Sequence, residues 1–372
     1  GDGKTVARVN DDPYDSFTHP ASLFGVCAWL EEELGVRWIM PGKLGEVIPK
    51  RSEIVVRDRE PRTGRPAGVQ RNIRFVGESY RKLYGSDARF DAWGVDREAR
   101  ARETRVWMRR QRLGRGGHFW ITHAFTKWLD LYGKEHPDYF AQQLDGTREW
   151  PGCWPKDAVR LCISNPAVVD QVVQNAKAYF ETQRLRSNLE NLAWPAGQND
   201  GNCGWCLCDK CRALDPPEAP LREFPYAMKG KHGAWIEKKV ELPRLTDRFV
   251  RFWNEIGKRF ETELPGRMVG IFVYGVTSQP PVREKYGPNL VCAFAANDCL
   301  IAPRGRSLDA FQRNIQQFYD AGLRNWYWRP NLMYYDMFGL PLIYAREAGE
   351  MFQYAMSRGA IGVDIDSWQG HW

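Results

Sequence analysis

Residues 246–275 read TDRFVRFWNEIGKRFETELPGRMVGIFVYG and contain one expected helix followed by one expected strand. In the first part, apolar residues recur every three to four positions, which predicts a helix with one buried face that begins near Thr246. These residues are Phe249, Trp253, Ile256, Phe260 and Leu264. The second part, MVGIFVYG, is a continuous apolar run with β-branched and aromatic residues, which predicts a buried strand. A helix that leads directly into a buried strand is typical of α/β proteins with parallel sheets.

The same alternation of strand-like and helical stretches extends along most of the chain. Strand-like runs occur at eight places: RNIRFVG (71–77), HFWITHAF (118–125), VRLCIS (159–164), NLENLAW (188–194), MVGIFVYG (268–275), LVCAFAA (290–296), NWYWRP (325–330) and AIGVDID (360–366). Eight β/α units in about 300 residues predict a (β/α)8 barrel of the TIM type, an α/β fold whose chemistry lies at the C-terminal ends of its strands. An open doubly wound sheet is the alternative, but GxGxxG after the first strand and GxxxxGK[ST] are both absent.

A smaller unit is expected to precede the barrel. Residues 21–34 place Leu23, Cys27 and Leu30 on one helical face, and Gly35 is a natural helix end. Two short strand-like runs and a linker rich in charge, Pro and Gly follow. The sequence therefore predicts a small α/β domain over residues 1–60, expected to be incomplete in this chain, and a barrel over 69–372, with a Pro-rich insertion at about 212–245.

Composition excludes several classes of protein. The chain has 372 residues, of which 43% are hydrophobic and 27% charged, and its mean hydropathy is −0.55. No run reaches the roughly 18 apolar residues of a membrane span, so no membrane partner is expected. The net charge of +7 comes mostly from arginine, which favours recognition of anionic groups. The 16 tryptophans, several of them in polar stretches, are the first indication of a function.

Polar and aromatic side chains follow most of the predicted strands. Sugars present C–H faces that pack on aromatic rings and hydroxyls that bond to polar side chains, so this mixture favours a carbohydrate substrate. The substrate-binding candidates are Arg74, His118, His123, Trp194, Asn199, Trp205, Tyr274, Asn297, Trp326, Trp328 and Trp368. Each polar member is also an ordinary turn or strand residue, so the hypothesis depends on their convergence in space.

Glycoside cleavage needs a carboxylic acid to protonate the leaving oxygen and a second group opposite it. Asp200, in WPAGQNDG, is the preferred acid. Asp298, Asp364 and Asp366 are the catalytic candidates for the second role. A separation of about 5 Å would make the second group a nucleophile, and about 6.5–9.5 Å would make it a base; both remain open.

Four cysteines form the most distinctive local motif. They are Cys203, Cys206, Cys208 and Cys211, and only Leu207 separates the two C-x2-C pairs. A structural zinc site that uses some of them, with help from Cys153 or Cys162, is one interpretation, and disulfides within the set are equally favoured. The proposed acid–base chemistry itself requires no cofactor.

Eight arginines lie between Asp96 and Arg115. They could contact nucleic acid, but a solvated helix face with pairs such as Glu98 and Arg102 is the favoured interpretation. Nucleic acid is therefore not an expected partner.

Four blocks of the sequence resemble known families. LFGVCAWLEEELGVRWIMPGKLGEVIPK (23–50) resembles the small α/β domain that precedes the barrel in alpha-glucuronidases and beta-hexosaminidases. EHPDYFAQQLDGTRE (135–149), VRLCISNPAVVDQVV (159–173) and NDGNCGWCLCDKC (199–211) resemble the glycoside-hydrolase-like family known as domain of unknown function 4838.

This resemblance implies a (β/α)8 barrel that acts on a glycan, in secreted or periplasmic proteins of bacteria that degrade polysaccharides. Where the hexosaminidases carry an Asp-Glu pair after the fourth strand, this chain has Asn199 and Asp200, so the acid would be the shorter Asp200. We therefore expect a glycosidase that acts on a poly- or oligosaccharide, with an acidic sugar favoured by the arginine excess. The alternative is a non-catalytic glycan-binding protein on the same barrel.

Overall fold

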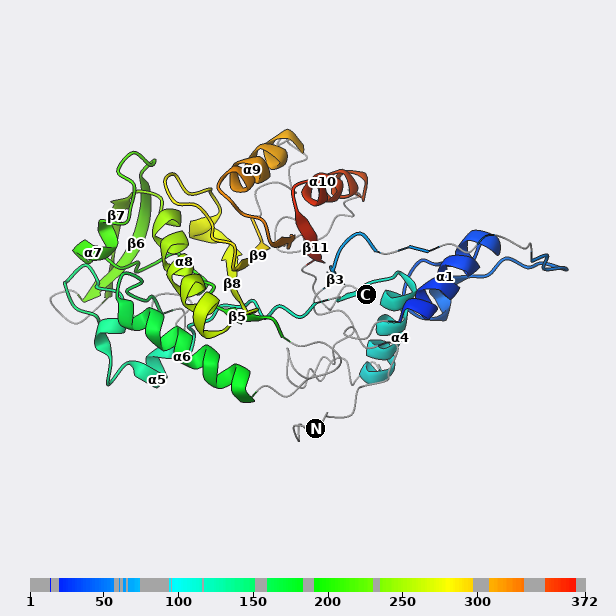
Figure 1. Cartoon of the computed structure of the whole chain (residues 1–372), viewed down its shortest axis with the longest axis horizontal. Helices are drawn as coiled ribbons and strands as arrows, with labels where there is room; N and C mark the ends of the chain where they lie inside the picture. The colour runs from blue at the N-terminus through cyan, green and yellow to red at the C-terminus, as the bar shows by residue number, and fades with distance from the viewer. Residues whose placement is uncertain are drawn as a thin grey trace.

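The computed structural model describes the chain at residues 14, 20–56, 60, 63–64, 66–73, 94, 96–115, 117–150, 159–182, 191–229, 235–296, 308–330 and 345–365. These residues form a mixed α/β body from which a smaller unit of helices α1 and α4 extends, at the right of Figure 1.

A curled seven-stranded sheet lies at the centre of the body, in the order β4-β3-β11-β10-β9-β8-β5. Its strands are β3 (Gln70–Ile73), β4 (Gly114–Arg115), β5 (Ala193–Pro195), β8 (Met268–Val273), β9 (Leu290–Phe294), β10 (Trp326–Trp328) and β11 (Ala360–Ile365). Neighbouring strands are parallel throughout, except that β4 runs antiparallel to β3. Beyond β5, single parallel bridges join His118 to Asn191 and His123 to Gly197.

The predicted α/β class is confirmed, whereas a closed eight-stranded barrel is not. Six of the eight expected strands pair in this sheet, and the 118–125 run adds only the two bridges. The run VRLCIS (159–164) was expected as a strand of the barrel, and this is wrong. Its backbone pairs antiparallel with residues 139–141, because Ala141 N donates to Arg160 O and Cys162 N donates to Tyr139 O. Within the described residues the sheet is therefore a half-barrel.

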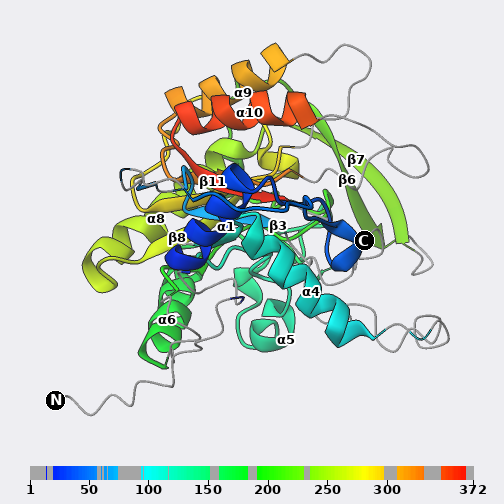
Figure 2. The same cartoon turned by 90° about the vertical axis from the view of Figure 1, so that its right-hand side faces the viewer.

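Helices cover the outer face of the sheet, as Figures 1 and 2 show. They include α6 (Pro166–Thr182), α8 (Thr246–Glu263), α9 (Leu308–Asp320) and α10 (Ala345–Ser357), with the short α5 (Trp128–Tyr132) and α7 (Asp209–Arg212) beside them. Helix α6 begins at Pro166, which suits the first helical turn. The side chain of the preceding Asn165 caps the helix, because its Oδ1 accepts the N–H of Ala167. The expected apolar faces of α6 and α8 are buried in one large core cluster.

The inner face of the sheet carries a second, smaller cluster. Phe272, Ala293 and Tyr327 form it, and Ile121, Tyr274 and Ile361 pack against it. Side chains alternate between the two faces of a strand, so the flanking residues of β8 and β10 belong to the helix-covered core instead. The curled sheet thus has a covered outer face and an inner face on which aromatic and polar side chains meet.

The insertion expected at about 212–245 contains a long hairpin. Strands β6 (Arg222–Lys229) and β7 (Trp235–Leu242) pair antiparallel over eight residues each, from the Arg222–Leu242 pair to the Lys229–Trp235 pair. Tyr226, on β6, is fully buried and its hydroxyl donates to the carbonyl of Trp205. The hairpin is thereby fastened to the cysteine-containing loop that follows β5.

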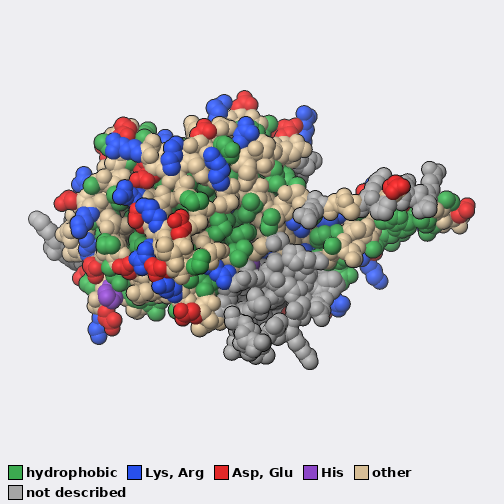
Figure 3. Space-filling model, viewed as in Figure 1, with side chains coloured by type: hydrophobic (Ala, Val, Ile, Leu, Met, Phe, Trp, Pro, Cys, Tyr) green, Lys and Arg blue, Asp and Glu red, His purple; other side chains and the backbone are tan. Residues whose placement is uncertain are grey.

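The N-terminal unit consists of α1 (Ala21–Glu33), the strand pair β1 (Arg37–Trp38) and β2 (Glu46–Val47), and α4 (Arg97–Arg110). The carbonyl of Trp38 accepts hydrogen bonds from Trp107 Nε1 at 2.9 Å and Gln111 Nε2 at 2.6 Å. Much of the surface of this unit is apolar (Figure 3). The side chain of Leu44 is 93% exposed, and that of Ile39 is 69% exposed.

The arginine run on α4 is used within this unit. Arg110 pairs with Glu46 at 2.6 Å and Arg112 pairs with Glu31, while Arg109 is buried. Three of the eight arginines thus stabilise the N-terminal unit. Among the described residues, none of the helices has both the length and the apolar character needed to cross a membrane.

Gly362 lies where β11 passes closest to β3. Its φ of +147° is a backbone conformation that side-chain-bearing residues rarely adopt, and an added Cβ would lie 1.7 Å from the carbonyl oxygen of Gln70. We expect Gly362→Ala to lower the free energy of unfolding by about 3 kcal/mol, measured by denaturant titration.

Gly349, in α10, is the matched control for this substitution because nothing lies within 4 Å of its added Cβ. Gly349→Ala should raise the free energy of unfolding by about 0.5–1 kcal/mol, since alanine is the better helix former. Equal effects of the two substitutions would show that the close approach of β11 to β3 does not contribute to the free energy of unfolding.

Candidate functional site

Asp200 lies in the loop after β5, at the C-terminal edge of the parallel strands. Its Oδ1 accepts the N–H of Gly201 at 2.8 Å and the hydroxyl of Tyr274 at 3.1 Å. Tyr274 follows β8, the strand beside β5. Two donors thus hold the carboxylate, in a residue that is half-buried. The structure thus joins two of the predicted site residues by a direct hydrogen bond.

Arg160 binds this loop through three backbone carbonyls. Its guanidinium donates to the carbonyls of Asn199 and Asp200, both at 2.7 Å, and to that of Cys203 at 3.0 Å. The side chain is buried and lies 4.0 Å from the ring centre of Trp205. Burial lowers the pKa of Arg160 to about 9, and the nearby charge of Asp200 partly opposes this shift. Sequence reasoning missed Arg160, although an arginine inside an apolar run such as VRLCIS was the available signal.

His123 lies beside Tyr274 at the same edge of the sheet. Its Nδ1 donates to the carbonyl of Gln198 at 2.6 Å, which leaves Nε2 as the acceptor in the neutral ring. The His123 ring centre is 6.0 Å from that of Tyr274 and 5.2 Å from that of Phe272. The Gln198 amide in turn donates to Tyr274 O and Thr277 Oγ1, both at 2.9 Å. The loop after β5 is therefore bonded to the loop after β8 through Gln198 as well as through Asp200.

Asp364 occupies the inner face at another part of the sheet. Its Oδ1 accepts the side-chain N–H of Asn72 at 2.7 Å, and both residues are buried. Val363 packs with the helix-covered core, so the next side chain, Asp364, points to the inner face. The guanidinium of Arg329 lies on this face too, 4.9 Å from the ring centre of Phe272. A carboxylate and a cation are thus added to the aromatic inner surface.

Several expected sugar contacts are used by the fold instead. Trp205, Trp326 and Trp328 are at most 4% exposed within the outer core, where no sugar ring can reach. Trp194 is half-buried and packs on Trp120 and on Tyr179 of α6, also on the outer side. For Trp205, Trp326 and Trp328 the expected role as sugar platforms is therefore corrected to one in core packing.

Two polar candidates also have other places in the structure. Asn199 is buried, and its amide accepts from Phe125 N and donates to Val159 O, so it stabilises the loop and does not face a ligand. His118 lies beside Asn191, before β5, and so at the opposite end of the strand from Asp200. The remaining candidates, Arg74, Asn297, Asp298, Asp366 and Trp368, lie outside the described residues.

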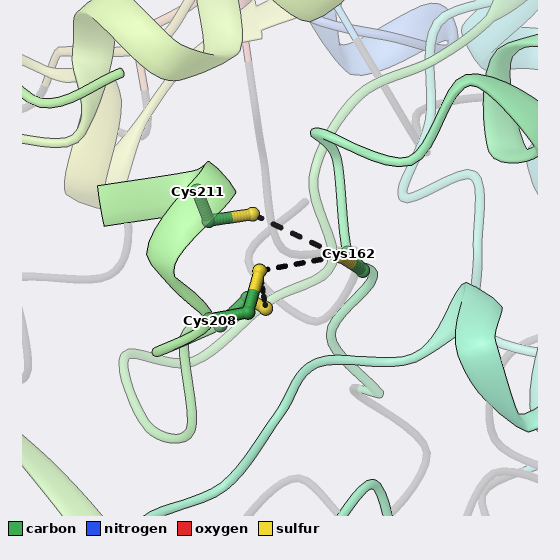
Figure 4. A group of neighbouring side chains, drawn as sticks. Cys162, Cys208 and Cys211 are labelled. Carbon is green, nitrogen blue, oxygen red and sulfur yellow. Dashed lines mark hydrogen bonds between the residues drawn. The ribbon is translucent and has the colours of Figure 1, made fainter. Parts of the chain in front are cut away.

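Four cysteine sulfurs gather where the 159–164 segment meets α7 (Figure 4). They belong to Cys162, Cys206, Cys208 and Cys211, and all lie within 4.8 Å of one another, so together they could hold a metal ion. The expected set needs one correction: Cys203 is in a disulfide, and Cys162 takes the fourth place. Disulfides among Cys206, Cys208 and Cys211, the other interpretation of the motif, are not formed.

Hydrogen bonds surround these sulfurs. Gln142 N donates to Cys206 Sγ at 3.3 Å, and Ser164 Oγ lies 3.1 Å from Cys211 Sγ. The pKa of the Cys162 thiol is held far below its usual range because the thiols of Cys206 and Cys211 donate hydrogen bonds to it. The sulfurs therefore lie in a polar, hydrogen-bonded environment.

No curated protein matches the chain. No solved structure matches it either. One family does, described as Domain of unknown function (DUF4838), over residues 40–334. Since this match spans well over half of the chain, the protein belongs to the DUF4838 family.

Proposed function

We propose that this protein is a glycoside hydrolase whose general acid is Asp200. The observation that carries the proposal is the carboxylate of Asp200, a half-buried residue, held by Tyr274 and Gly201 at the C-terminal edge of parallel strands. In barrel enzymes this edge is where the chemistry occurs, and we infer that the curled sheet is a variant of the (β/α)8 barrel. The donors hold the carboxylate in one orientation, as proton transfer to a glycosidic oxygen requires.

Asp364 is the second carboxylate that the described part of the chain offers on the inner face. Glycosidases pair the acid with a nucleophile or a base, and Asp364 is held in place by Asn72 for either role. His123, with Nε2 as acceptor in its neutral ring, and the hydroxyl of Tyr274 supply contacts for sugar hydroxyls. Arg329 on the inner face supports an acidic sugar, because guanidinium groups bind carboxylates with matched geometry.

The disulfide at Cys203 supports action in an oxidising compartment, in line with the secreted or periplasmic location that the family resemblance implies. The four-thiol cluster does not supply the chemistry in this proposal. A zinc ion bound there would be structural, because four cysteine ligands leave no open position for water or substrate.

A panel of aryl glycosides and acidic oligosaccharides tests the function. Turnover that is lost in Asp200→Asn supports the hydrolase, whereas affinity for a glycan that persists in Asp200→Asn with no turnover by either protein supports the glycan-binding alternative. Isothermal titration with the same oligosaccharides provides the binding measurement.

Tyr274→Phe removes one donor to Asp200 while it keeps the ring. A hydrogen bond to a charged group contributes about 1.5–3 kcal/mol, so kcat should fall about 10- to 100-fold while KM changes little. Steady-state kinetics on the best substrate of the panel gives both constants.

Tyr132→Phe is the matched control, since the hydroxyl of Tyr132 also donates over 3.1 Å but to Asn175 and not to Asp200. It should leave kcat unchanged. A loss of kcat in Tyr132→Phe as large as in Tyr274→Phe would mean that Tyr274 acts through stability alone.

A further inference from the structure

We propose that Cys162, Cys206, Cys208 and Cys211 bind one zinc ion as a closed tetrahedral site, and that this ion fastens the loop after β5 to the 159–164 segment. The two parts lie more than 40 residues apart in sequence, and the sulfur atoms are where they meet (Figure 4).

The spacing of the sulfurs fits a zinc ion. With a Zn–S bond of about 2.3 Å, the sulfurs of a regular tetrahedron lie about 3.8 Å apart. The sulfur of Cys162 lies 3.7 Å from that of Cys208 and 3.9 Å from that of Cys211, and the sulfurs of Cys206 and Cys208 are 3.5 Å apart. A disulfide would need about 2.05 Å. The cluster therefore has the dimensions of a tetrathiolate centre.

The surroundings complete a second shell for such an ion. Four thiolates and Zn²⁺ carry a formal charge of about −2, which a buried site must offset. Arg148 interacts electrostatically with Cys162, Cys206 and Cys208, and Arg248 does so with Cys206 and Cys211. The N–H of Gln142 points at Cys206 Sγ, as donors to thiolate ligands do.

The donor set narrows the choice of ion to metals that bind sulfur. Sulfur ligands alone exclude calcium and magnesium, which take oxygen ligands, and suit zinc or iron. The presence of a disulfide elsewhere in the loop also supports a bound metal. Conditions that maintain the disulfide at Cys203 would also oxidise four neighbouring thiols, unless a metal ion held them as thiolates.

The position of the site gives the ion a defined task. Arg160 is two residues before Cys162, and its guanidinium holds the carbonyls of Asn199, Asp200 and Cys203. A zinc ion bound to Cys162 and Cys206 therefore fixes the segment that carries Arg160. It also fixes the loop whose carbonyls Arg160 binds. Only this consequence for Asp200 rests on the proposed function; metal binding does not.

Metal analysis of the full chain, purified without chelators, tests the site directly. We expect about one zinc per chain by mass spectrometry of the metal, and loss of that zinc in Cys162→Ser and Cys206→Ser. Cys27→Ala, a buried free cysteine in α1, is the control that should retain it. Iron in place of zinc, disulfides among the four cysteines, or metal-free protein with four reactive thiols would each overturn the assignment.

Cobalt replacement keeps the test independent of how the variants fold. Titration of the metal-depleted wild type with Co²⁺ should give thiolate-to-cobalt charge transfer and the intense visible bands of a tetrahedral complex, which one equivalent of Zn²⁺ displaces. Weak absorption typical of octahedral cobalt would contradict the four-thiolate site.

Hydrogen exchange then measures, without any substrate, whether the zinc ion fastens the loop after β5 to the 159–164 segment. Removal of the metal should increase exchange in residues 199–211 at least about tenfold, with the strands β8 and β9 unchanged. Unchanged exchange in residues 199–211 would contradict the fastening role. Because metal content and exchange are both measured without turnover, failure here is distinguishable from failure of the glycosidase proposal.

Discussion

Asp200→Asn is expected to lower kcat/KM on glycosides with poor leaving groups by about 10²- to 10⁴-fold, the contribution typical of general acid catalysis. The amide keeps the shape of the side chain and can still accept from Tyr274 and Gly201, so the loop should remain in place. It has no carboxyl proton to give to the leaving oxygen. Activated aryl glycosides need less protonation, so on them kcat/KM should fall less. Steady-state kinetics on both substrate types measures this difference.

Asp130→Asn provides the control for Asp200→Asn. Asp130 is an exposed carboxylate on α5, and its replacement makes the same chemical change away from the proposed site. It should leave kcat/KM unchanged on both substrate types. An Asp200→Asn protein with wild-type turnover would exclude Asp200 as the acid, and the search would move to the other carboxylates at the strand ends.

Asp215→Ala is expected to lower the free energy of unfolding by about 3–5 kcal/mol, because it leaves the charge of Arg248 buried without its partner. The two side chains are only 3% and 2% exposed. Arg248 Nε donates to Asp215 Oδ1 at 2.7 Å, Nη2 donates to Oδ2, and Nη1 donates to the carbonyl of Cys206 at 3.0 Å. Denaturant unfolding at a fixed zinc concentration gives the change, so that metal loss does not contribute.

The pair of Arg283 and Glu218 is the matched comparison, since it has the same two-point geometry but side chains that are 57% and 46% exposed. Glu218→Ala should cost no more than about 1 kcal/mol, as exposed ion pairs do. If both substitutions cost equally little, burial would not determine the value of these pairs.

Local patterns in the sequence predicted the local structure well. The apolar spacing of α6 and α8 and the cap at Asn165 concern contacts within a helix or between a helix and its nearest strand. The long apolar runs of β8 and β9 were predicted as buried strands, and both strands are buried on both faces. The 159–164 run looked the same, yet it pairs with residues 139–141, a choice set by tertiary contacts and not by its composition.

The candidate site was predicted less completely. Asp200 and Tyr274 were proposed separately, and the structure joins them. The tryptophans on β10 could not be assigned from sequence, because a ring that packs in the core and one that stacks on a sugar occur in similar strands. Cys162 was only an auxiliary candidate because its distance from Cys206 in sequence conceals its contact with the cluster.

The parallel pairing of β3 with β11 has a consequence for synthesis on the ribosome. Asn72 and Asp364 are direct partners, although 292 residues separate them. At about 5–20 residues per second, one edge of β3 waits roughly 15–60 s for its partner strand to be made. Its other edge can pair early with β4, which lies much closer in the chain. During translation the nascent chain therefore carries an open strand edge until almost its last described residue has left the exit tunnel, and in that interval a chaperone is the natural protection for it.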